Sequence, residues 1–209
     1  KDWIKPYLNR LNDDLAFFNV PFNLNTIYIG GGTPTVLTYR ELKKLLSLLA
    51  PYAKNVKEYT VEANIESITP KKLELMKEFG VNRLSIGVQS TNDERLMSLN
   101  RKHSYSAIKR KIALVKKHGF TNFSVDLIYG LPGQDLAELN CDITNILKLD
   151  PPHIATYDLQ IETNTVAYIK KWPKISDEES RLMYETVVSR LRKEGYKRYE
   201  ISNFAKKHF

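Results

Sequence analysis

Cysteine is almost absent from this sequence, and long apolar runs are missing. The single thiol, Cys141, excludes an internal disulfide framework and a metal site built from several cysteines of these 209 residues. No apolar run approaches the roughly 18 to 20 residues that cross a bilayer, so a transmembrane span is excluded. The first residues, KDWIKPYLNR, also lack the apolar core of a secretory signal. These absences predict a cytoplasmic protein.

Acidic residues are outnumbered by basic ones. Asp and Glu total 24 against 32 Lys and Arg, which gives a formal net charge of +8. Such a balance permits binding to nucleic acid, anionic lipid or an anionic small molecule. The lysines, however, recur at helical spacing, as at Lys71, Lys72 and Lys77, and no basic run alternates with aromatic residues. We interpret them as solvated helix faces and expect no nucleic-acid partner.

Short apolar segments alternate with amphipathic ones along the chain, and its length suits one domain over residues 1–209. Apolar, β-branched segments predict strands at 26–29, 58–63, 83–87, 123–129, 153–159 and 198–202. Helical patterns predict helices near 39–49, 70–79, 92–99, 106–118, 136–147 and 177–193. Strands that alternate with helices predict a parallel sheet of the α/β class.

The C-terminal ends of the expected strands distinguish between two α/β architectures. Each end carries a small or polar residue, and these residues are Gly30, Glu62, Gln89, Asp126, Asp158 and Glu200. A doubly wound dinucleotide fold would concentrate its signal in one glycine-rich loop. In a (β/α) barrel the reactive residues lie at the C-terminal ends of several strands. The pattern therefore favours a TIM-type barrel.

The segment GGGTPT, residues 30–35, directly follows the first expected strand. It is neither a G-x-G-x-x-G motif nor a P-loop. Three glycines permit either a tight turn or the close approach of a ligand to the backbone. The residues themselves leave both interpretations open.

Four polar side chains stand out against apolar surroundings. Glu62 and Asp126 interrupt apolar strands, where a carboxylate needs a partner or a ligand. Gln89 and Arg101 follow the next expected strand. One such residue alone would be interpreted as a satisfied polar group or a helix cap. Four of them near successive strand ends predict a shared polar pocket.

Two further residues, His103 and Cys141, could have a chemical role, but we interpret both as structural. His103 could bind a ligand or donate a proton, although a local cap is the favoured interpretation. Cys141 is expected to be a buried small hydrophobe in a helix. No Ser and His spacing indicates a nucleophilic triad, and no cluster of His and carboxylates has metal-ligand spacing.

Seven segments, in this order from about residue 26 to the end, resemble the radical S-adenosylmethionine proteins related to oxygen-independent coproporphyrinogen III oxidase. They are TIYIGGGTPTVL, YTVEANIESIT, RLSIGVQS, LNRKHS, SVDLIYGLPGQ, LDPPHIATYDLQIETNT and YEISNFAKK. Within this family, LQIETNT and YEISNFA resemble the HemW-type heme chaperones.

The resemblance implies a partial (β/α)6 barrel of the radical SAM superfamily. It also implies a [4Fe-4S] cluster held by a CxxxCxxC loop after the first strand, with S-adenosylmethionine bound to the fourth iron. This sequence lacks that loop, so we expect the first strand and the cluster cysteines upstream of Lys1, and residues 1–209 alone should not hold the cluster. We expect a C-terminal domain and a heme-binding segment beyond Phe209. The stretch between Thr165 and Pro173 is short for the family, so residues are expected to be missing there.

The resemblance also implies site residues. By it, Gly31, Gly32 and Thr33 receive the methionine end of S-adenosylmethionine. The other implied contacts with this cofactor are Glu62, Gln89, Arg101 and Asp126. Two departures, Ile65 for a proline and Asn100 for a glycine, touch none of these positions.

The resemblance leaves two functions open. The favoured one is a HemW-like chaperone that binds heme and transfers it to an acceptor protein. The alternative is an oxygen-independent coproporphyrinogen III oxidase, an enzyme of porphyrin biosynthesis that draws on an electron donor. A generic (β/α) isomerase or lyase with Glu62 and Asp126 as acid and base would ignore the ordered motifs and ranks last.

Overall fold

The structure, a computed structural model, describes residues 3–18 and 24–209. Its strands are β1 (Thr26–Ile29), β2 (Glu58–Asn64), β3 (Arg83–Gln89), β4 (Asn122–Tyr129), β5 (His153–Asp158), β6 (Tyr196–Arg198) and β7 (Asn203–Lys206). They form one sheet in the order β1-β2-β3-β4-β5-β7-β6. Strands β1 to β5 run parallel, β7 pairs antiparallel with β5, and β6 pairs antiparallel with β7.

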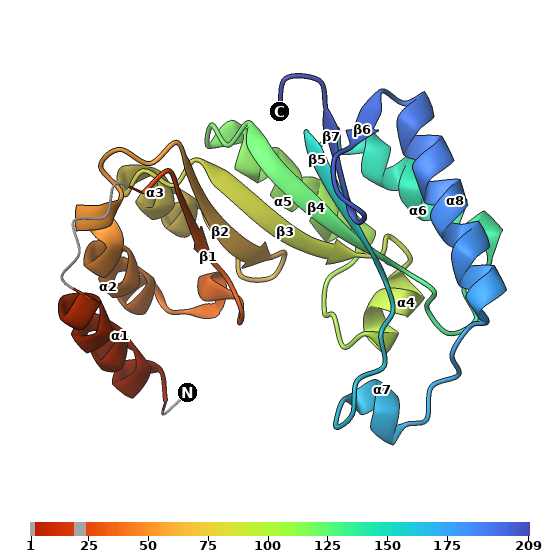
Figure 1. Cartoon of the computed structure of the whole chain (residues 1–209), viewed down its shortest axis with the longest axis horizontal. Coiled ribbons are helices and arrows are strands. Elements are labelled where there is room, and N and C mark those ends of the chain that lie inside the picture. The colour runs from red at the N-terminus through yellow and green to blue at the C-terminus, as the bar shows by residue number, and fades with distance from the viewer. Residues whose placement is uncertain (1–2, 19–23) are drawn as a thin grey trace.

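Helices connect the strands. The α-helices are α1 (Ile4–Phe18), α2 (Tyr39–Leu49), α3 (Pro70–Glu78), α4 (Asp93–Ser98), α5 (Tyr105–Lys117), α6 (Leu136–Lys148), α7 (Val166–Ile169) and α8 (Asp177–Lys193), and two short 3-10 turns are η1 (Pro34–Val36) and η2 (Ala50–Tyr52). Figure 1 shows α2, α3, α5, α6 and α8 along one face of a curved sheet, which we call the outer face. None of the helices in the described part of the chain combines the length and the apolar character needed to cross a bilayer.

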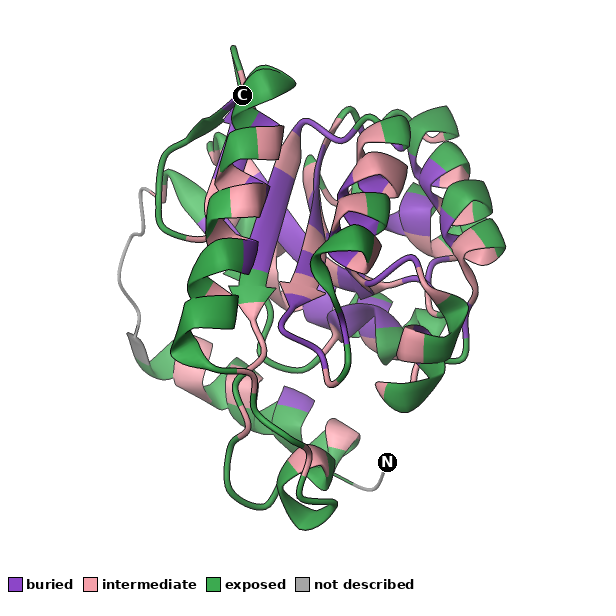
Figure 2. Cartoon of the chain, turned by 90° about the vertical axis from the view of Figure 1, so that its right-hand side faces the viewer, coloured by how far each residue is buried: buried purple, intermediate pink, exposed green. Residues whose placement is uncertain are grey.

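Strand β2 shows why the two faces of the sheet differ. Tyr59, Val61 and Ala63 are buried and belong to the hydrophobic core, together with leucines of α2 and α3. Glu62 and Asn64 alternate with them and are only partly buried, because successive side chains of a strand point to opposite faces. Figure 2 shows buried residues gathered on the strands and on the helix sides that meet them. The other face of the sheet, the inner face, therefore remains polar.

The α/β class predicted from the sequence is confirmed, and several helix boundaries follow from capping. The helices at 39–49 and 177–193 begin and end at the predicted residues. At the start of α2, the Thr38 side chain accepts from the N–H of Glu41 at 3.3 Å. The Glu41 carboxylate accepts in return from the N–H of Thr38 at 2.8 Å. This reciprocal capping box satisfies two donors that the helix itself cannot pair.

The expected strand at 198–202 is wrong. Arg198 ends β6, and residues 199–202 form the turn of a hairpin that returns as β7. The carboxylate of Glu200 closes the turn by accepting from the N–H of Ser202 at 3.0 Å and from Nδ2 of Asn203 at 2.7 Å. Ser and Asn favour turns because their side chains satisfy local backbone groups. The sheet consequently has five parallel strands and an antiparallel hairpin where six parallel strands were expected.

Helices α1 and α7 escaped the sequence analysis. Helix α1 nevertheless carries Ile4, Leu8, Leu11 and Leu15 at helical spacing, a pattern that indicates an amphipathic helix. Of these four side chains, that of Leu8 is buried. Helix α7 has four residues, none of which is buried, and it is too short to show a periodic pattern.

Candidate cofactor-binding site

The register of the parallel strands arranges polar residues in rows across the inner face. Glu62 of β2 lies opposite Ser85 of β3. In the next row toward the C-terminal ends, Asn64, Gly87 and Asp126 lie side by side on β2, β3 and β4. Since parallel strands end at the same edge of a sheet, these residues lie near the loops that follow each strand.

Glu62 binds the glycine-rich loop after β1. Its Oε2 accepts from the backbone N–H of Gly31 at 3.2 Å, and its Oε1 accepts from the Tyr28 hydroxyl at 2.8 Å. A Cβ at Gly30 would lie 2.5 Å from Oε1 of Glu62 and 2.6 Å from Cε1 of Tyr28. A side chain at position 30 would therefore have to displace the Glu62 carboxylate or the Tyr28 ring, which pack directly against the Gly30 backbone.

The next three residues leave backbone open. A Cβ at Gly31 or Gly32 would have no protein atom within 4 Å, and Gly31 has a φ of 90°. Thr33 precedes η1, and its carbonyl oxygen accepts from the N–H of Val36 at 3.1 Å while its side chain makes no capping bond. The loop thus presents backbone that a ligand could approach without meeting a side chain.

Arg101 contacts Asn64, and the Gln89 side chain lies over Gly87. The Arg101 Nη1 donates to Oδ1 of Asn64 at 3.3 Å. A Cβ at Gly87 would lie 2.8 Å from Nε2 of Gln89 and 3.5 Å from Oδ1 of Asn64. Gln89 has a φ of 73°, and Asn100, the residue before Arg101, has a φ of 57°. The first loop therefore takes a left-handed turn at Gln89 itself, and the second does so one residue before Arg101.

The surroundings of Asp126 strongly shift the pKa of its carboxyl group. Burial, and next the negative charge of Glu62, raise the pKa of Asp126 to about 7, against the opposing effects of Arg83, a hydrogen bond with Ser85, and Arg101. Burial and the hydrogen bond with Glu62 likewise raise the pKa of Tyr28 to about 12. The negative charge of Glu62 thus adds to burial in disfavouring ionisation of Asp126.

The structure links several of the seven residues singled out in the sequence: Glu62 bonds Gly31, and Asp126 interacts electrostatically with Glu62 and Arg101. We call the seven predicted residues the inner-face cluster, and its members are Gly31, Gly32, Thr33, Glu62, Gln89, Arg101 and Asp126. Two other residues expected at strand ends do not join it. Asp158 accepts from the Ser180 hydroxyl of α8 at 2.8 Å, and Glu200 bonds within its own turn.

Three residues that contact this cluster escaped the sequence analysis, namely Tyr28, Asn64 and Ser85, as did Thr35, which bonds Asn64. Alternation along YTVEAN places Asn64 on the same face as Glu62, so the period-two pattern could have found it. Thr35 carries no comparable signal. It is fully buried, and its hydroxyl lies 2.7 Å from Oγ of Ser67 and accepts from the N–H of Asn64 at 3.4 Å.

The expectation that Cys141 is buried is wrong, because its neighbour takes that position. Cys141 is exposed on α6, whereas Asp142 is 1% exposed. The Asp142 carboxylate accepts from the Ser90 hydroxyl at 3.0 Å and from the N–H of Thr91 at 2.7 Å. A buried carboxylate is tolerated where such donors surround it. This carboxylate fixes the loop that directly follows Gln89.

The interpretation of His103 as a local cap is also wrong. Ser104 caps α5 by accepting from the N–H of Ala107 at 3.3 Å. The His103 side chain is instead buried, and its Nδ1 lies 2.7 Å from Oε1 of Glu66 in the turn after β2. The hydrogen bond therefore connects two loops that are far apart in the sequence.

The residues present do not fit an iron–sulfur cluster. Across the described ranges, no three His, Cys, Asp or Glu side chains are grouped as metal ligands. Cys141 lies on α6, and one thiolate cannot replace the several that such a cluster needs.

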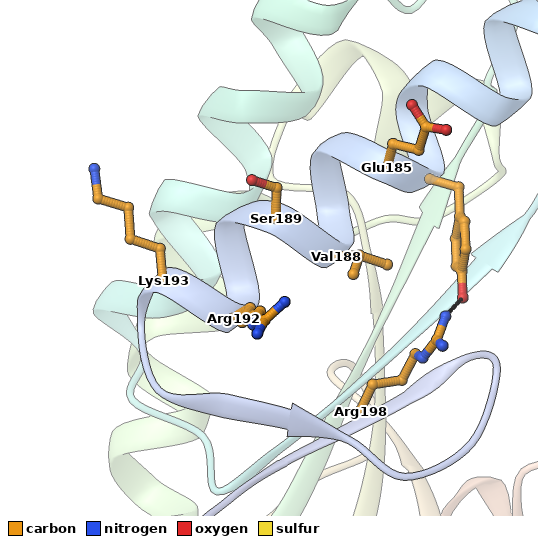
Figure 3. A pocket seen from close by; sticks show the side chains of 7 residues that line it. Glu185, Val188, Ser189, Arg192, Lys193 and Arg198 are labelled. Carbon is orange, nitrogen blue, oxygen red and sulfur yellow. Dashed lines mark hydrogen bonds between the residues drawn. The ribbon is translucent and has the colours of Figure 1, made fainter.

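Two open cavities lie away from the carboxylates. One, of about 700 Å³, lies between α1, β1 and α2 and touches the glycine-rich loop, with Trp3, Tyr7 and Leu45 among its lining residues. The other, of about 680 Å³, lies on the outer face between α8 and β6 (Figure 3), where Arg198 donates to the Tyr184 hydroxyl at 2.6 Å. The second cavity therefore opens on the opposite face of the sheet from the inner-face cluster.

Comparison with known proteins identifies the family of this chain and known structures that share its fold. A family model described as the Radical SAM superfamily matches residues 11–140. The chain is 39% identical over 214 residues to the heme chaperone HemW of Bacillus subtilis strain 168, across 97% of this chain and 56% of that protein. It is 32% identical over 182 residues to the oxygen-independent coproporphyrinogen-III oxidase-like protein HemZ of the same strain, across 84% of this chain and 36% of HemZ.

The chain spans about half the length of the curated heme chaperones that it matches. Among solved structures, it superposes on the coproporphyrinogen III oxidase HemN of Escherichia coli with a TM-score of 0.85 and 24% identity. That superposition covers 99% of this chain and 49% of HemN, and it confirms the expected barrel-type fold.

Replacement of Gly30 by alanine should destabilise the fold. The new Cβ would push against Glu62 and Tyr28, so Gly30→Ala is expected to lower the free energy of unfolding by about 1–3 kcal/mol. Gly32→Ala is the matched control because open space surrounds position 32, and it should change the free energy by at most about 0.5 kcal/mol. Urea denaturation measures both, and equal effects of the two variants would contradict the packing described here.

Asp126 should make stability depend on pH. Between pH of about 4 and 7 the folded chain keeps a proton on Asp126 that the unfolded chain releases, so the free energy of unfolding falls as pH rises through this window. Asp126→Asn cannot ionise and should lose this part of the slope. Urea denaturation at several pH values compares the two proteins. Parallel profiles would show that Asp126 titrates normally.

Proposed function

Because the chain belongs to the Radical SAM superfamily, we propose that the inner-face cluster binds S-adenosylmethionine. The observation that carries this proposal is the convergence of Glu62, Asp126 and Arg101 near backbone that no side chain covers. S-adenosylmethionine has an ammonium group, a carboxylate, a sulfonium charge and ribose hydroxyls. A site with two carboxylates, one guanidinium and open backbone offers partners for each of these groups.

Each side chain has a role that follows from its chemistry. Glu62 and Asp126 can accept hydrogen bonds from ammonium and hydroxyl groups, and Arg101 can pair with a carboxylate through two parallel N–H donors. Gln89 can both donate and accept. When bound, S-adenosylmethionine supplies the one-electron chemistry of the superfamily, and the barrel orients and shields it.

The raised pKa of Asp126 has a consequence for binding a cation. Its pKa of about 7 means that a substantial fraction of Asp126 is protonated near neutral pH. A positive charge beside this carboxylate favours the ionised form. Binding of a sulfonium or ammonium group would therefore release a proton from Asp126, and the new ion pair would offset the desolvation of both groups.

We propose that the ligands of a [4Fe-4S] cluster lie outside residues 1–209, upstream of Lys1. The open backbone at Gly31 and Gly32 supports a cofactor site, but the single cysteine does not support a cluster within these residues. A sequence upstream of Lys1 without three closely spaced cysteines would make the protein a relative without radical chemistry.

For the whole protein we propose heme binding and heme transfer to an acceptor protein. Support comes from relatives named heme chaperones, which are 34–39% identical over 96–100% of this chain. The HemZ likeness keeps oxidative decarboxylation of coproporphyrinogen III as the second candidate, together with the electron donor that it needs.

Binding of S-adenosylmethionine should depend on Arg101. In the full-length protein with its cluster reconstituted, Arg101→Ala should weaken binding by about 10- to 100-fold, the range of about 1.5–3 kcal/mol for a charged hydrogen bond. Arg192→Ala, on the outer face beside α8 and β6, is the matched control and should bind like the wild type. Titration calorimetry measures the three affinities. Equal affinities would remove Arg101 from the site.

Heme transfer should separate the two candidate functions. The full-length protein is expected to take up heme, followed by Soret absorbance, and to pass it to an acceptor apoprotein. Under anaerobic conditions with reductant, S-adenosylmethionine and coproporphyrinogen III, it should form no protoporphyrinogen IX by chromatography. Multiple turnovers of decarboxylation without heme transfer would reverse the order of the candidates.

A further inference from the structure

Arg101 lies in a loop that is attached to the turn after β2. Oε1 of Glu66 accepts from the backbone N–H of Lys102 at 3.2 Å and lies 2.7 Å from Nδ1 of His103. The His103 side chain is 2% exposed, whereas that of Glu66 is 37% exposed. A single carboxylate oxygen thus contacts both residues that directly follow Arg101.

The turn that carries Glu66 also carries the residue that Arg101 contacts. Asn64 accepts from Arg101 at 3.3 Å through its side chain. Its carbonyl oxygen accepts from the N–H of Ser67 at 3.0 Å, which closes the turn around Glu66. The backbone N–H of Arg101 donates to the carbonyl of Leu96, within α4, at 2.8 Å. Movement of the loop relative to this turn would therefore move the guanidinium away from Asn64.

The charge state of Glu66 suits its hydrogen bonds with Lys102 and His103. Burial raises the pKa of Glu66, but the hydrogen bond with His103 and bonds from backbone N–H groups outweigh burial, so the pKa lies below its usual range. Glu66 is therefore ionised near neutral pH and can accept from both donors. Hydrogen bonds to a charged acceptor are stronger than those between neutral groups.

We propose that Glu66 and His103 are positioning residues, which hold the loop of residues 101–103 so that Arg101 reaches the cofactor carboxylate. The inference rests on the proposed binding of S-adenosylmethionine to the inner-face cluster. Neither Glu66 nor His103 needs to touch the cofactor, since both act through Arg101.

A double-mutant cycle between Glu66 and Arg101 tests whether Glu66 acts on cofactor binding through Arg101. The full-length protein with its cluster reconstituted is titrated with S-adenosylmethionine as wild type, Glu66→Ala, Arg101→Ala and the double variant. Glu66→Ala should weaken binding about 10-fold. The double variant should bind no more weakly than Arg101→Ala, because Glu66 has nothing left to position. A purely structural role would instead make the two effects multiply.

Two conservative variants and one control sharpen the result. Glu66→Gln retains an acceptor oxygen, and His103→Asn retains a donor near the place of Nδ1, so both should bind within about 3-fold of the wild type. Glu74→Ala breaks another His–Glu pair, in which Oε1 of Glu74 lies 3.7 Å from Nε2 of His118. It should leave the affinity unchanged. Should Glu66→Ala not fold, His103→Leu fills the buried space without donating and takes its place in the cycle.

The outcomes separate this inference from the function on which it rests. A wild type that binds no S-adenosylmethionine overturns the proposed function and the positioning role together. An Arg101→Ala variant with wild-type affinity removes Arg101 from the site and overturns the positioning role, while the proposed binding of S-adenosylmethionine stands. Weak binding by Arg101→Ala with wild-type affinity in Glu66→Ala overturns the positioning role alone. Multiplicative effects in the double variant overturn it as well.

Discussion

The hydrogen bond from the Gly31 N–H to the Glu62 carboxylate joins the first two parallel strands at the edge where the candidate site lies. Its geometry constrains the residues around it. The carboxylate packs so close to Gly30 that a side chain there would displace it, and the Tyr28 hydroxyl donates to its second oxygen. Because both oxygens of Glu62 are engaged by protein donors, the loop is held in place while the backbone at Gly32 stays uncovered. Order in the loop and openness to a ligand therefore have the same origin.

A second set of hydrogen bonds fixes the turn after β2 to the glycine-rich loop and the loop after β3 to α6. Thr35 connects the glycine-rich loop to the turn after β2 through Ser67, and Asp142 of α6 fixes the backbone at Thr91, two residues beyond Gln89. These ties run between loops and helices that are separated by 32 to 52 residues in the sequence. Each side chain is buried or partly buried, so its hydrogen bonds compete little with water. The site is thus built on several cross-links between loops rather than on one rigid element.

The sequence predicts the sheet and its main helices well because their signals are local. Alternation in β2 and the capping box at Thr38 each depend on a few neighbouring residues. The convergence of Glu62 and Asp126 was also accessible, since parallel strands end at one edge. Burial of Asp142 in place of Cys141 was not, because it depends on donors about 50 residues away. The hairpin after Arg198 had a local turn signal, but the alternation of Tyr199 and Ile201 with polar residues resembles a strand and concealed it.

The carboxylates of Glu62 and Asp126 lie close enough to interact. This arrangement is unfavourable for an ionised Asp126, since burial and the charge of Glu62 both disfavour its ionisation. Arg83 and Arg101 oppose these effects without outweighing them, so the pKa of Asp126 remains raised. Polar groups that a fold leaves in such an environment are typical of binding sites, where a ligand supplies the missing partner. A cation beside these two carboxylates would oppose both effects that disfavour ionisation of Asp126. The raised pKa of Asp126 and the proposed preference for a positively charged ligand therefore have the same electrostatic cause.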